Sequence, residues 1–294
     1  MRTPARVATF AAALGVTFGA AALVGASVDP LRDSDESHGH EAEPSAGHGD
    51  GHGQAPEADA AAEQPVGLAV AQDGYRLEAE ATALPLGRDA ELAFRIAGPD
   101  GAPVTDFEVE HERRMHLIVV RRDLTGFQHL HPRMDAGGRW GIRLRLPEAG
   151  VYRAYADFSA GGRSMTLATD LVVRGPFAPR ALPAPAPTDT TAGYTVTLAA
   201  DELEAGADAE LAYDVRLGGR PVDDLEPYLG ADGHLVALRE GDLAFLHVHP
   251  EESATPGRIR FGASLPSPGR YRLFFQFKHD GVVRTVAHTL DVPR

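Results

Sequence analysis

The stretch Asp89-Ala-Glu-Leu-Ala-Phe-Arg-Ile96 alternates polar and apolar side chains, and it occurs again, little changed, as Asp208-Ala-Glu-Leu-Ala-Tyr-Asp-Val215. Such alternation is typical of a β-strand with one buried face. Other short pieces occur in both halves in the same order: Gly74-Tyr75 and Gly193-Tyr194, Pro103-Val104 and Pro221-Val222, Gly150-x-Tyr152-Arg153 and Gly269-x-Tyr271-Arg272. The chain therefore carries two copies of one β-module.

Each copy consists of short alternating runs separated by Gly, Pro and Asp, a pattern typical of an all-β sandwich. We therefore predict an all-β fold with two tandem immunoglobulin-like β-sandwiches after an N-terminal helix and a disordered tether. The predicted boundaries are 1–30 for a signal peptide or membrane anchor, 31–66 for the tether, 67–175 for the first module, 176–191 for a Pro/Ala-rich linker and 192–294 for the second module.

The N-terminal segment has the composition of an export signal. Two arginines precede a run without charge, residues 7–28, that is rich in Ala, Gly, Leu and Val. This order predicts either a signal peptide, with residues 1–26 removed, or a membrane anchor, and both alternatives stay open. In either case we expect the protein to be exported to the periplasm or the extracellular space, and anchored to the cytoplasmic membrane if the segment is retained.

The tether, residues 31–66, is acidic and rich in histidine. It holds nine acidic residues, one arginine and four histidines, His38, His40, His48 and His52, without a hydrophobic period. A flexible chain of imidazoles and carboxylates chelates Cu(II), Ni(II) or Zn(II) weakly. A solvated spacer is the alternative, and the two roles are compatible.

Composition excludes several classes of protein. The 294 residues include no cysteine, which excludes a disulfide framework, a zinc ribbon, a thiol nucleophile and an iron–sulfur cluster. The net charge is −14 without a basic block, so we expect no nucleic acid as a partner. Neither a nucleophile motif nor a phosphate loop occurs, and we predict that the protein is not an enzyme.

Three histidines recur in each copy with the same spacing. In the first copy His116 precedes His129-x-His131-Pro132, and in the second copy His234 precedes His247-x-His249-Pro250. Each block predicts a β-hairpin, with turns near 123–126 and 241–244. Residues two apart on a strand point to the same face, so the two histidines of each His-x-His converge.

The hairpin predicts a metal site in each copy. If Arg122 lies opposite Phe127, Ile118 lies opposite His131 and His116 is its diagonal neighbour on the same face. Three neutral imidazoles on one face can bind Cu(II) or Zn(II). The candidate ligands are therefore His116, His129 and His131 in the first copy, and His234, His247 and His249 in the second. The alternative is that the strand is central and that its histidines are core residues bonded to backbone carbonyls.

Softer ligands distinguish the first copy from the second. Met134 and Met165 are candidate thioether ligands that would let the first copy hold Cu(I) as well as Cu(II), although methionine is common in cores. His111 has the wrong strand parity and joins the triad only through a bulge. The roles of His279 and His288 in the second copy stay open.

The blocks FEVEHERRMHLIVVRRDLTGFQHLHP and YLGADGHLVALREGDLAFLHVHP, each followed by Gly-x-Tyr-Arg, resemble a family of exported bacterial proteins with duplicated His…His-x-His-Pro modules. More distantly, the chain is similar to YtkA-like and CopC-type periplasmic copper-binding domains. The resemblance covers about residues 67 to 294 and implies heavy-metal binding, chiefly of copper, in the cell envelope. A CopC-type Cu(II) site uses the mature N-terminal amine, which is remote from either module here, so only the metal class is carried over.

We therefore predict an exported heavy-metal-binding protein that captures or buffers copper, as Cu(II) rather than Cu(I), with zinc as a second candidate. The expected partners are metal ions, with a metal transporter or another envelope protein as a candidate for delivery. Affinity should fall below about pH 6.5, where an ordinary imidazole becomes protonated. The alternative is a non-metal immunoglobulin-like interaction or adhesion module whose histidines are structural.

Overall fold

The computed structural model describes residues 66–200, 203–246, 248–251, 253 and 255–293, which belong to one compact unit. The predicted export segment and the tether up to residue 65 lie outside the described residues, as does His247. The described part of the chain consists of strands and loops, and none of its secondary structure is a helix of the length and apolarity that a bilayer crossing needs.

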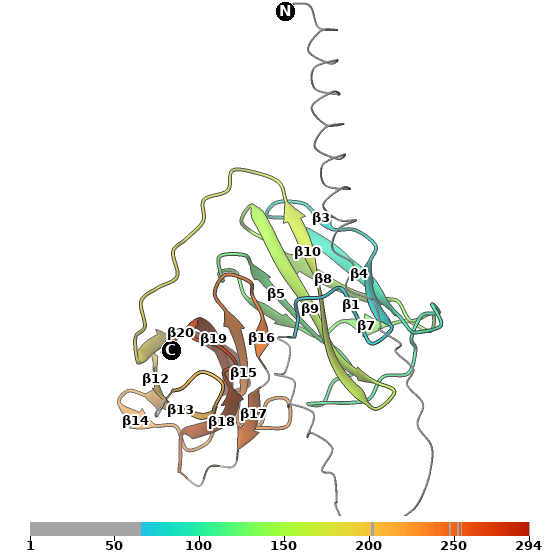
Figure 1. The fold of residues 1–294 in the computed structure, drawn as a ribbon. Helices are drawn as coiled ribbons and strands as arrows, with labels where there is room; N and C mark the ends of the chain where they lie inside the picture. The colour runs from blue at the N-terminus through green and yellow to red at the C-terminus, as the bar shows by residue number, and fades with distance from the viewer. Residues whose placement is uncertain (1–65, 201–202, 247, 252, 254, 294) are drawn as a thin grey trace, which may run out of the picture. The chain divides into compact units, whose positions relative to one another are not determined.

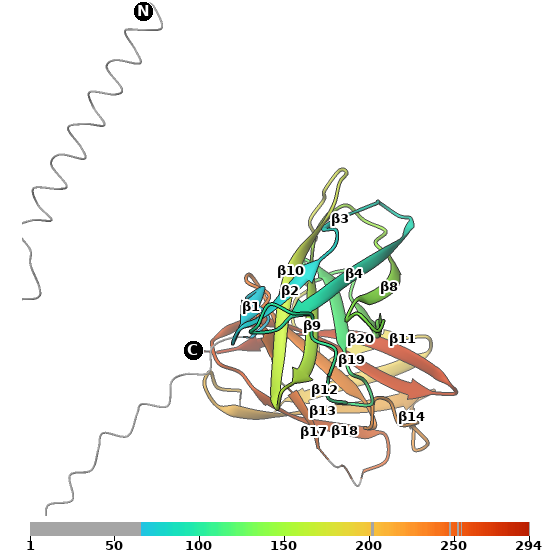
Figure 2. The same ribbon diagram turned by 90° about the vertical axis from the view of Figure 1, so that its right-hand side faces the viewer.

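The first copy forms two sheets of five strands each (Figure 1). One sheet has the order β1 (Ala71–Gln72), β2 (Tyr75–Ala79), β4 (Asp89–Ala97), β8 (Trp140–Arg145) and β7 (Arg133–Met134). The other, which we call the β5 sheet, has the order β3 (Ala83–Leu84), β10 (Arg163–Val173), β9 (Gly150–Ala160), β5 (His116–Arg121) and β6 (Gln128–Leu130). Figures 1 and 2 show β9 and β10 as a pair of long neighbouring strands.

The second copy repeats this plan. One sheet has the order β11 (Thr188–Thr191), β12 (Tyr194–Ala200), β13 (Asp208–Leu217), β18 (Arg258–Ser264) and β17 (Val248–Glu251), with β14 (Arg220–Pro221) paired to β13. The other, which we call the β15 sheet, has the order β16 (Phe245–Leu246), β15 (His234–Arg239), β19 (Gly269–His279) and β20 (Val282–Val292). The predicted fold class, two tandem immunoglobulin-like β-sandwiches, is confirmed.

The alternating stretches that revealed the repeat are β4 and β13, and they supply one layer of each core. Leu92, Phe94 and Ile96 are all buried in the first core, and Leu211, Tyr213 and Val215 are all buried in the second. Because side chains alternate across a strand, the intervening residues point away from the core, although Ala93 and Ala212 among them are buried as well. Phe107 packs edge-on against Trp140 in the first core.

The two sandwiches share a third apolar cluster, formed by the outer faces of the β5 and β15 sheets. Its buried members are Ile118, Val120, Leu124, Tyr155 and Ala168 from the first sandwich, and Val236, Leu238, Leu243, Phe245 and Phe274 from the second. Phe127 stacks on Phe274 with 4.1 Å between ring centroids. Tyr155 donates a hydrogen bond across the interface to the carbonyl of Leu243 at 2.6 Å. The β5 and β15 sheets are therefore buried on both faces where the two sandwiches meet.

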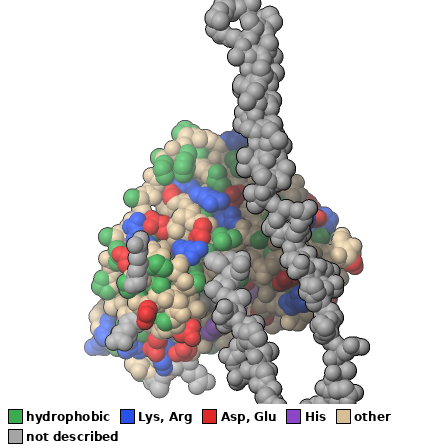
Figure 3. All heavy atoms as spheres, in the orientation of Figure 1, with side chains coloured by type: hydrophobic (Ala, Val, Ile, Leu, Met, Phe, Trp, Pro, Cys, Tyr) green, Lys and Arg blue, Asp and Glu red, His purple; other side chains and the backbone are tan. Residues whose placement is uncertain are grey.

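The outer surface carries paired charges. Figure 3 shows basic and acidic side chains lying next to each other on the face that it presents. Arg139 contacts both Glu80 and Glu91 at 2.8 and 3.2 Å. Such exposed pairs add little to stability, so the apolar clusters are the main source of the fold's stability.

Candidate metal centre

Strand β5 directs His116 to the interface between the sandwiches. The residues of β5 alternate, so Leu117 and Val119 enter the core of the first sandwich, while Ile118 and Val120 face the second. His116 belongs to the latter row and is 4% exposed. The sequence could not tell these two faces apart, because both are apolar.

The hairpin that follows β5 brings His129 and His131 to the same face. The turn lies where it was predicted, with Leu124 and Gly126 at positive φ and the amide of Arg121 bonded to the carbonyl of Thr125 at 2.8 Å. The predicted register was wrong, however. Ile118 pairs with His129, not with His131. Because the error is two residues, the histidines keep the predicted face.

The three imidazoles of the first copy meet at one point. One ring nitrogen from each of His116, His129 and His131 lies within 4.8 Å of the others. The ring centroids are 5.3 Å apart for His116 and His129, 5.1 Å for His116 and His131, and 4.8 Å for His129 and His131. The first predicted triad is therefore assembled in space.

Two oxygen atoms determine which nitrogens carry protons. His116 Nε2 lies 3.1 Å from the backbone carbonyl of Glu110, and His129 Nδ1 lies 2.8 Å from Oε1 of Gln276. Both oxygens only accept hydrogen bonds, so each of these nitrogens donates. A neutral imidazole has a single N–H, so His116 Nδ1 and His129 Nε2 are unprotonated and each has a free lone pair. These two atoms face each other at 3.1 Å.

The amide of Gln276 has a second contact. Its Nε2 lies 3.1 Å from Oγ1 of Thr285 while Oε1 faces His129, and because a hydroxyl both donates and accepts, Thr285 satisfies the amide in either orientation. With the amide turned, Nε2 would donate to His129, and the chain of contacts from Glu110 to Thr285 would be complete without an ion. The two orientations correspond to the two interpretations of the histidines, as ligands and as structural residues.

His131 has an unsatisfied nitrogen at the same place. Its Nε2 is buried and lacks a hydrogen-bond partner. Leaving a buried polar atom unpaired costs about 1–3 kcal/mol, and a bound cation would satisfy it. Two nitrogens that bind one ion at about 2.0–2.1 Å lie about 2.9–3.4 Å apart, which matches the 3.1 Å between His116 Nδ1 and His129 Nε2. The spacing of His116 and His129 therefore fits two ligands of a Cu(II) or Zn(II) ion, and His131, whose ligand nitrogen lies within 4.8 Å of the other two, would move closer to complete the set.

Burial keeps these imidazoles neutral. It lowers the pKa of His129 to about 3, aided by the neighbouring imidazoles and opposed by the Gln276 hydrogen bond. Burial likewise lowers the pKa of His131 to about 4, and the pKa values of His116 and His234 are also lowered, chiefly by burial. Only the neutral imidazole binds a metal, so the cluster is in its ligand form at neutral pH.

The second predicted triad is divided. His234 lies on β15 beside the first triad, with its ring centroid 4.7 Å from that of His129. His249 is exposed on β17, where it pairs with Gly262 in the opposite sheet of the second sandwich. His247 is not among the described residues. In the part of the chain that the structure describes, a second histidine group with close ligand atoms is not formed.

His111 is a further histidine of the cluster. Its ring centroid lies 6.1 Å from that of His116 and 6.0 Å from that of His234. A tight turn places it there: the backbone amides and carbonyls of Glu110 and Arg113 bond to each other, and His111 and Glu112 both have positive φ. The expectation that only a bulge could bring His111 near the triad was wrong, because this turn does so.

The other candidate ligands belong to the cores. Met165 pairs with Phe158 in the β5 sheet and faces the first core, and Met134 packs against the same core. The Cu(I) site with thioether ligands is therefore not formed. His279 contacts Tyr194 and Asp224 at 2.6 and 2.9 Å. His288 is buried beside Tyr213 in the second sandwich.

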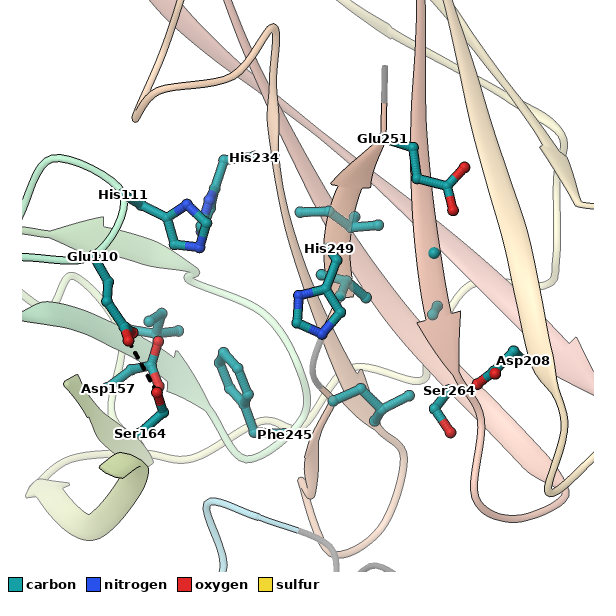
Figure 4. A pocket seen from close by; sticks show the side chains of 16 residues that line it. Glu110, His111, Asp157, Ser164, Asp208, His234, Phe245, His249, Glu251 and Ser264 are labelled. Carbon is teal, nitrogen blue, oxygen red and sulfur yellow. Dashed lines mark hydrogen bonds between the residues drawn. The ribbon is translucent and has the colours of Figure 1, made fainter. Parts of the chain in front are cut away.

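A cleft of about 970 Å³ adjoins the cluster (Figure 4). Figure 4 shows His111 and His234 on one side of it and His249 on the other. Carboxylates also line the cleft, among them Glu110 and Asp208. Glu110 accepts a hydrogen bond from Ser164 at 2.9 Å. The cleft reaches His234, and apolar side chains such as Leu235 and Phe245 line it beside these polar groups.

Solved structures with some likeness to the chain include bacterial adhesins and titin immunoglobulin domains. The Escherichia coli adhesin FdeC is 12% identical over 77% of this chain and 66% of its own, with a TM-score of 0.27. The Yersinia pseudotuberculosis adhesin InvE is 10% identical over 74% and 59%, with a TM-score of 0.23. A tandem of titin immunoglobulin domains is 15% identical over 74% and 94%, with a TM-score of 0.20. This chain spans less than two thirds of either adhesin.

Among curated proteins, a comparison of sequences finds no match. One family model matches the chain twice, over residues 69–175 and 189–294, and these two matches follow the two sandwiches. The chain therefore belongs to the family described as Domain of unknown function (DUF8832), of which it carries two copies.

Proposed function

We propose that this protein is an exported metal-binding protein that captures or buffers copper in the cell envelope, with zinc as the second candidate. The defined site is the triad His116, His129 and His131. The observation that carries the proposal is the contact between His116 Nδ1 and His129 Nε2 at 3.1 Å. When the second nitrogen of each ring donates to an oxygen, these two nitrogens are both unprotonated and can both bind a cation.

The hydrogen-bond partners of the triad support this proposal. Metal-binding histidines commonly donate their second N–H to a carbonyl or carboxylate, which fixes the ring and strengthens the ligand. The carbonyl of Glu110 and the side chain of Gln276 stand in these positions. Three imidazoles without a thiolate or a thioether favour Cu(II) or Zn(II) over Cu(I).

The alternative is an immunoglobulin-like interaction or adhesion module whose histidines are structural. FdeC and InvE are adhesins, but their likeness to this chain is too distant to distinguish the two functions. The alternative requires the Gln276 amide to be turned, so that a complete chain of hydrogen bonds holds the imidazoles. It predicts that a metal ion leaves the melting temperature unchanged.

Isothermal titration with Cu(II) and with Zn(II) distinguishes these functions. The full chain should be used with His38, His40, His48 and His52 all changed to Asn, so that weak binding by the tether does not obscure the site. We expect one tight ion per chain, loss of that ion in a His129→Gln/His131→Gln variant, and an unchanged ion in a His279→Gln control. A double variant with the parent stoichiometry would remove the triad as the site.

A further inference from the structure

His234 is the second sandwich's contribution to the histidine cluster. It lies on β15 opposite Gln276, and its side chain is half-buried. Its ring is nearly parallel to that of His116, at 9° with 5.9 Å between centroids, and it stacks closer to His129, at 4.7 Å. The imidazole of the second sandwich thus lies as close to His129 as the triad's own rings lie to one another, and somewhat farther from His116.

The repeat explains this meeting. His116 and His234 are equivalent residues of the two copies, on equivalent strands, and the faces that carry them pack against each other. The same equivalence holds for Ile118 and Val236 in the shared apolar cluster. When two copies of one sheet pack by the same outer face, equivalent residues approach one another. The repeat therefore places one histidine from each sandwich at the same point.

Among the described residues, the contacts given for the His234 imidazole are ring contacts with His111, His116 and His129. Burial and the neighbouring imidazoles oppose its charged form. The ionisable groups that act on His234 are all imidazoles, and none is a carboxylate that would stabilise its charged form: His111, His116, His129 and His131. Four imidazoles around a point form the ligand set of a tetrahedral Zn(II) or a tetragonal Cu(II) ion.

We propose that the metal ion is held between the two sandwiches, with His234 as a fourth imidazole ligand beside His116, His129 and His131. This inference rests on the proposed function, since it adds a ligand to the same site. It replaces the prediction of a separate site in each copy with one composite site, to which the second sandwich supplies both His234 and the Gln276 side chain that orients His129.

A composite site links metal binding to the docking of the sandwiches. An ion that binds only the docked arrangement stabilises it, and the docked arrangement in turn raises the affinity for the ion. The ion would act as a clamp across the apolar interface of Ile118, Tyr155 and Phe274. The linker between the modules then needs to keep the sandwiches only close enough for the ion to join them.

Electron paramagnetic resonance of Cu(II) tests the number of ligands directly. The full chain with the four tether histidines changed to Asn is compared with two further variants, His234→Gln and His279→Gln. Both remove an imidazole from the second sandwich, but only His234 lies at the cluster. We expect nitrogen superhyperfine structure from four imidazoles in the parent and in His279→Gln, and from three in His234→Gln. Cu(II) affinity should fall at least ~10-fold in His234→Gln alone.

Melting of each metal-free variant in EDTA shows whether it is folded, and a His234→Asn variant provides a second substitution if His234→Gln fails to fold. If the parent binds no tight ion, the proposed function and the composite site both fall. A different result overturns only the composite site: the parent binds an ion, the His129→Gln/His131→Gln variant loses it, and both His234 variants bind Cu(II) as tightly as His279→Gln does. The ion would then belong to the first sandwich alone.

Discussion

His129 of the first sandwich donates a hydrogen bond from Nδ1 to Oε1 of Gln276 in the second, at 2.8 Å. The equivalent of Gln276 in the first sandwich is Asp157, which lies opposite His116 just as Gln276 lies opposite His234. The threonines that contact them are equivalent too, since Thr166 donates to Asp157 and Thr285 accepts from Gln276. Both copies thus place a polar side chain opposite the β-strand histidine: a carboxylate, Asp157, in the first copy and a neutral amide, Gln276, in the second.

Gln276 therefore tests whether the second sandwich positions a ligand. Gln276→Leu removes the acceptor that fixes the His129 tautomer, and we expect Cu(II) affinity to fall by about 10–100-fold. Gln276→Glu keeps an acceptor and should retain or raise the affinity, because a carboxylate makes the imidazole a stronger ligand. Competitive titration against a chelator of known affinity measures both.

Gln128→Leu is the matched control for this change. Gln128 is next to His129 on β6, but its side chain donates to the carbonyl of Arg145, away from the cluster. It should bind Cu(II) as the parent does. Equal losses in Gln276→Leu and Gln128→Leu would mean that the affinity reports general damage to the hairpin and not the orientation of His129.

The metal-free protein should lose stability as the pH falls from 6.5 toward 4. The pKa values of His129 and His131 are about 3 and about 4 in the folded chain, against about 6.5 in the unfolded chain. Between these limits the unfolded state binds protons that the native state does not, so the free energy of unfolding rises with pH. Urea unfolding in EDTA at intervals from pH 7.5 to pH 4.5 measures the slope.

A His129→Gln/His131→Gln variant should show a shallower slope over the same range, because it lacks two of the titrating groups. Asp123 does not interfere: burial raises its pKa, but the hydrogen bonds from Arg121 and neighbouring donors outweigh burial and hold the pKa at about 2, so its contribution changes below this range. Identical slopes in parent and variant would contradict the neutral, buried state of these histidines. The lowered pKa values also move the expected loss of metal affinity from about pH 6.5 to a lower pH.

The methionines should not influence metal binding. Met134→Leu and Met165→Leu conserve volume in the first core, so each should cost less than about 1.5 kcal/mol of stability. Because their thioethers pack into the core, Cu(I) and Cu(II) affinities should both equal those of the parent. A Cu(I) affinity that falls in either variant, as measured with a colorimetric Cu(I) probe, would restore the thioether site.

The fold class and the first triad were predictable from local patterns. Alternation in β4 and β13 indicates strands with one buried face, and the turn residues near Leu124 and Gly126 indicate the hairpin. The triad requires only that its histidines lie on the same face of the hairpin. Pairing Ile118 with the wrong histidine was an error of two residues, which leaves the predicted face unchanged. The spacing of His129 and His131 was enough to place both on the face of His116.

The meeting of the sandwiches was not predictable from the same patterns. Apolar residues on both faces of β5 indicate burial of both faces, but not whether the second face meets a core or a neighbouring module. Ile118 and Val120 meet the neighbour. In the second copy the chain changes sheets before Val248, whereas in the first it does so after Leu130, and this difference separates His249 from His234.

The turn that carries His111 was missed for a different reason. Two consecutive residues with positive φ are usually Gly or Asn in such turns, whereas here they are His111 and Glu112, with φ of 45° and 63°. Without a glycine the sequence has no turn signal at this place. A non-glycine residue in this conformation costs about 1–2 kcal/mol, and such strain is often retained near functional sites.

Glu112→Gly should therefore stabilise the protein by about 1 kcal/mol, because glycine adopts this φ without strain. Glu112 is exposed, so the change removes no packing, and His111 keeps its place beside His116. Arg114→Gly is the control, since Arg114 is also exposed but has no positive φ, and there glycine should destabilise by increasing the entropy of the unfolded chain. Thermal melting in EDTA measures both. If Glu112→Gly melts lower than the parent, as Arg114→Gly should, then the turn is held without strain and the position of His111 requires no stored energy.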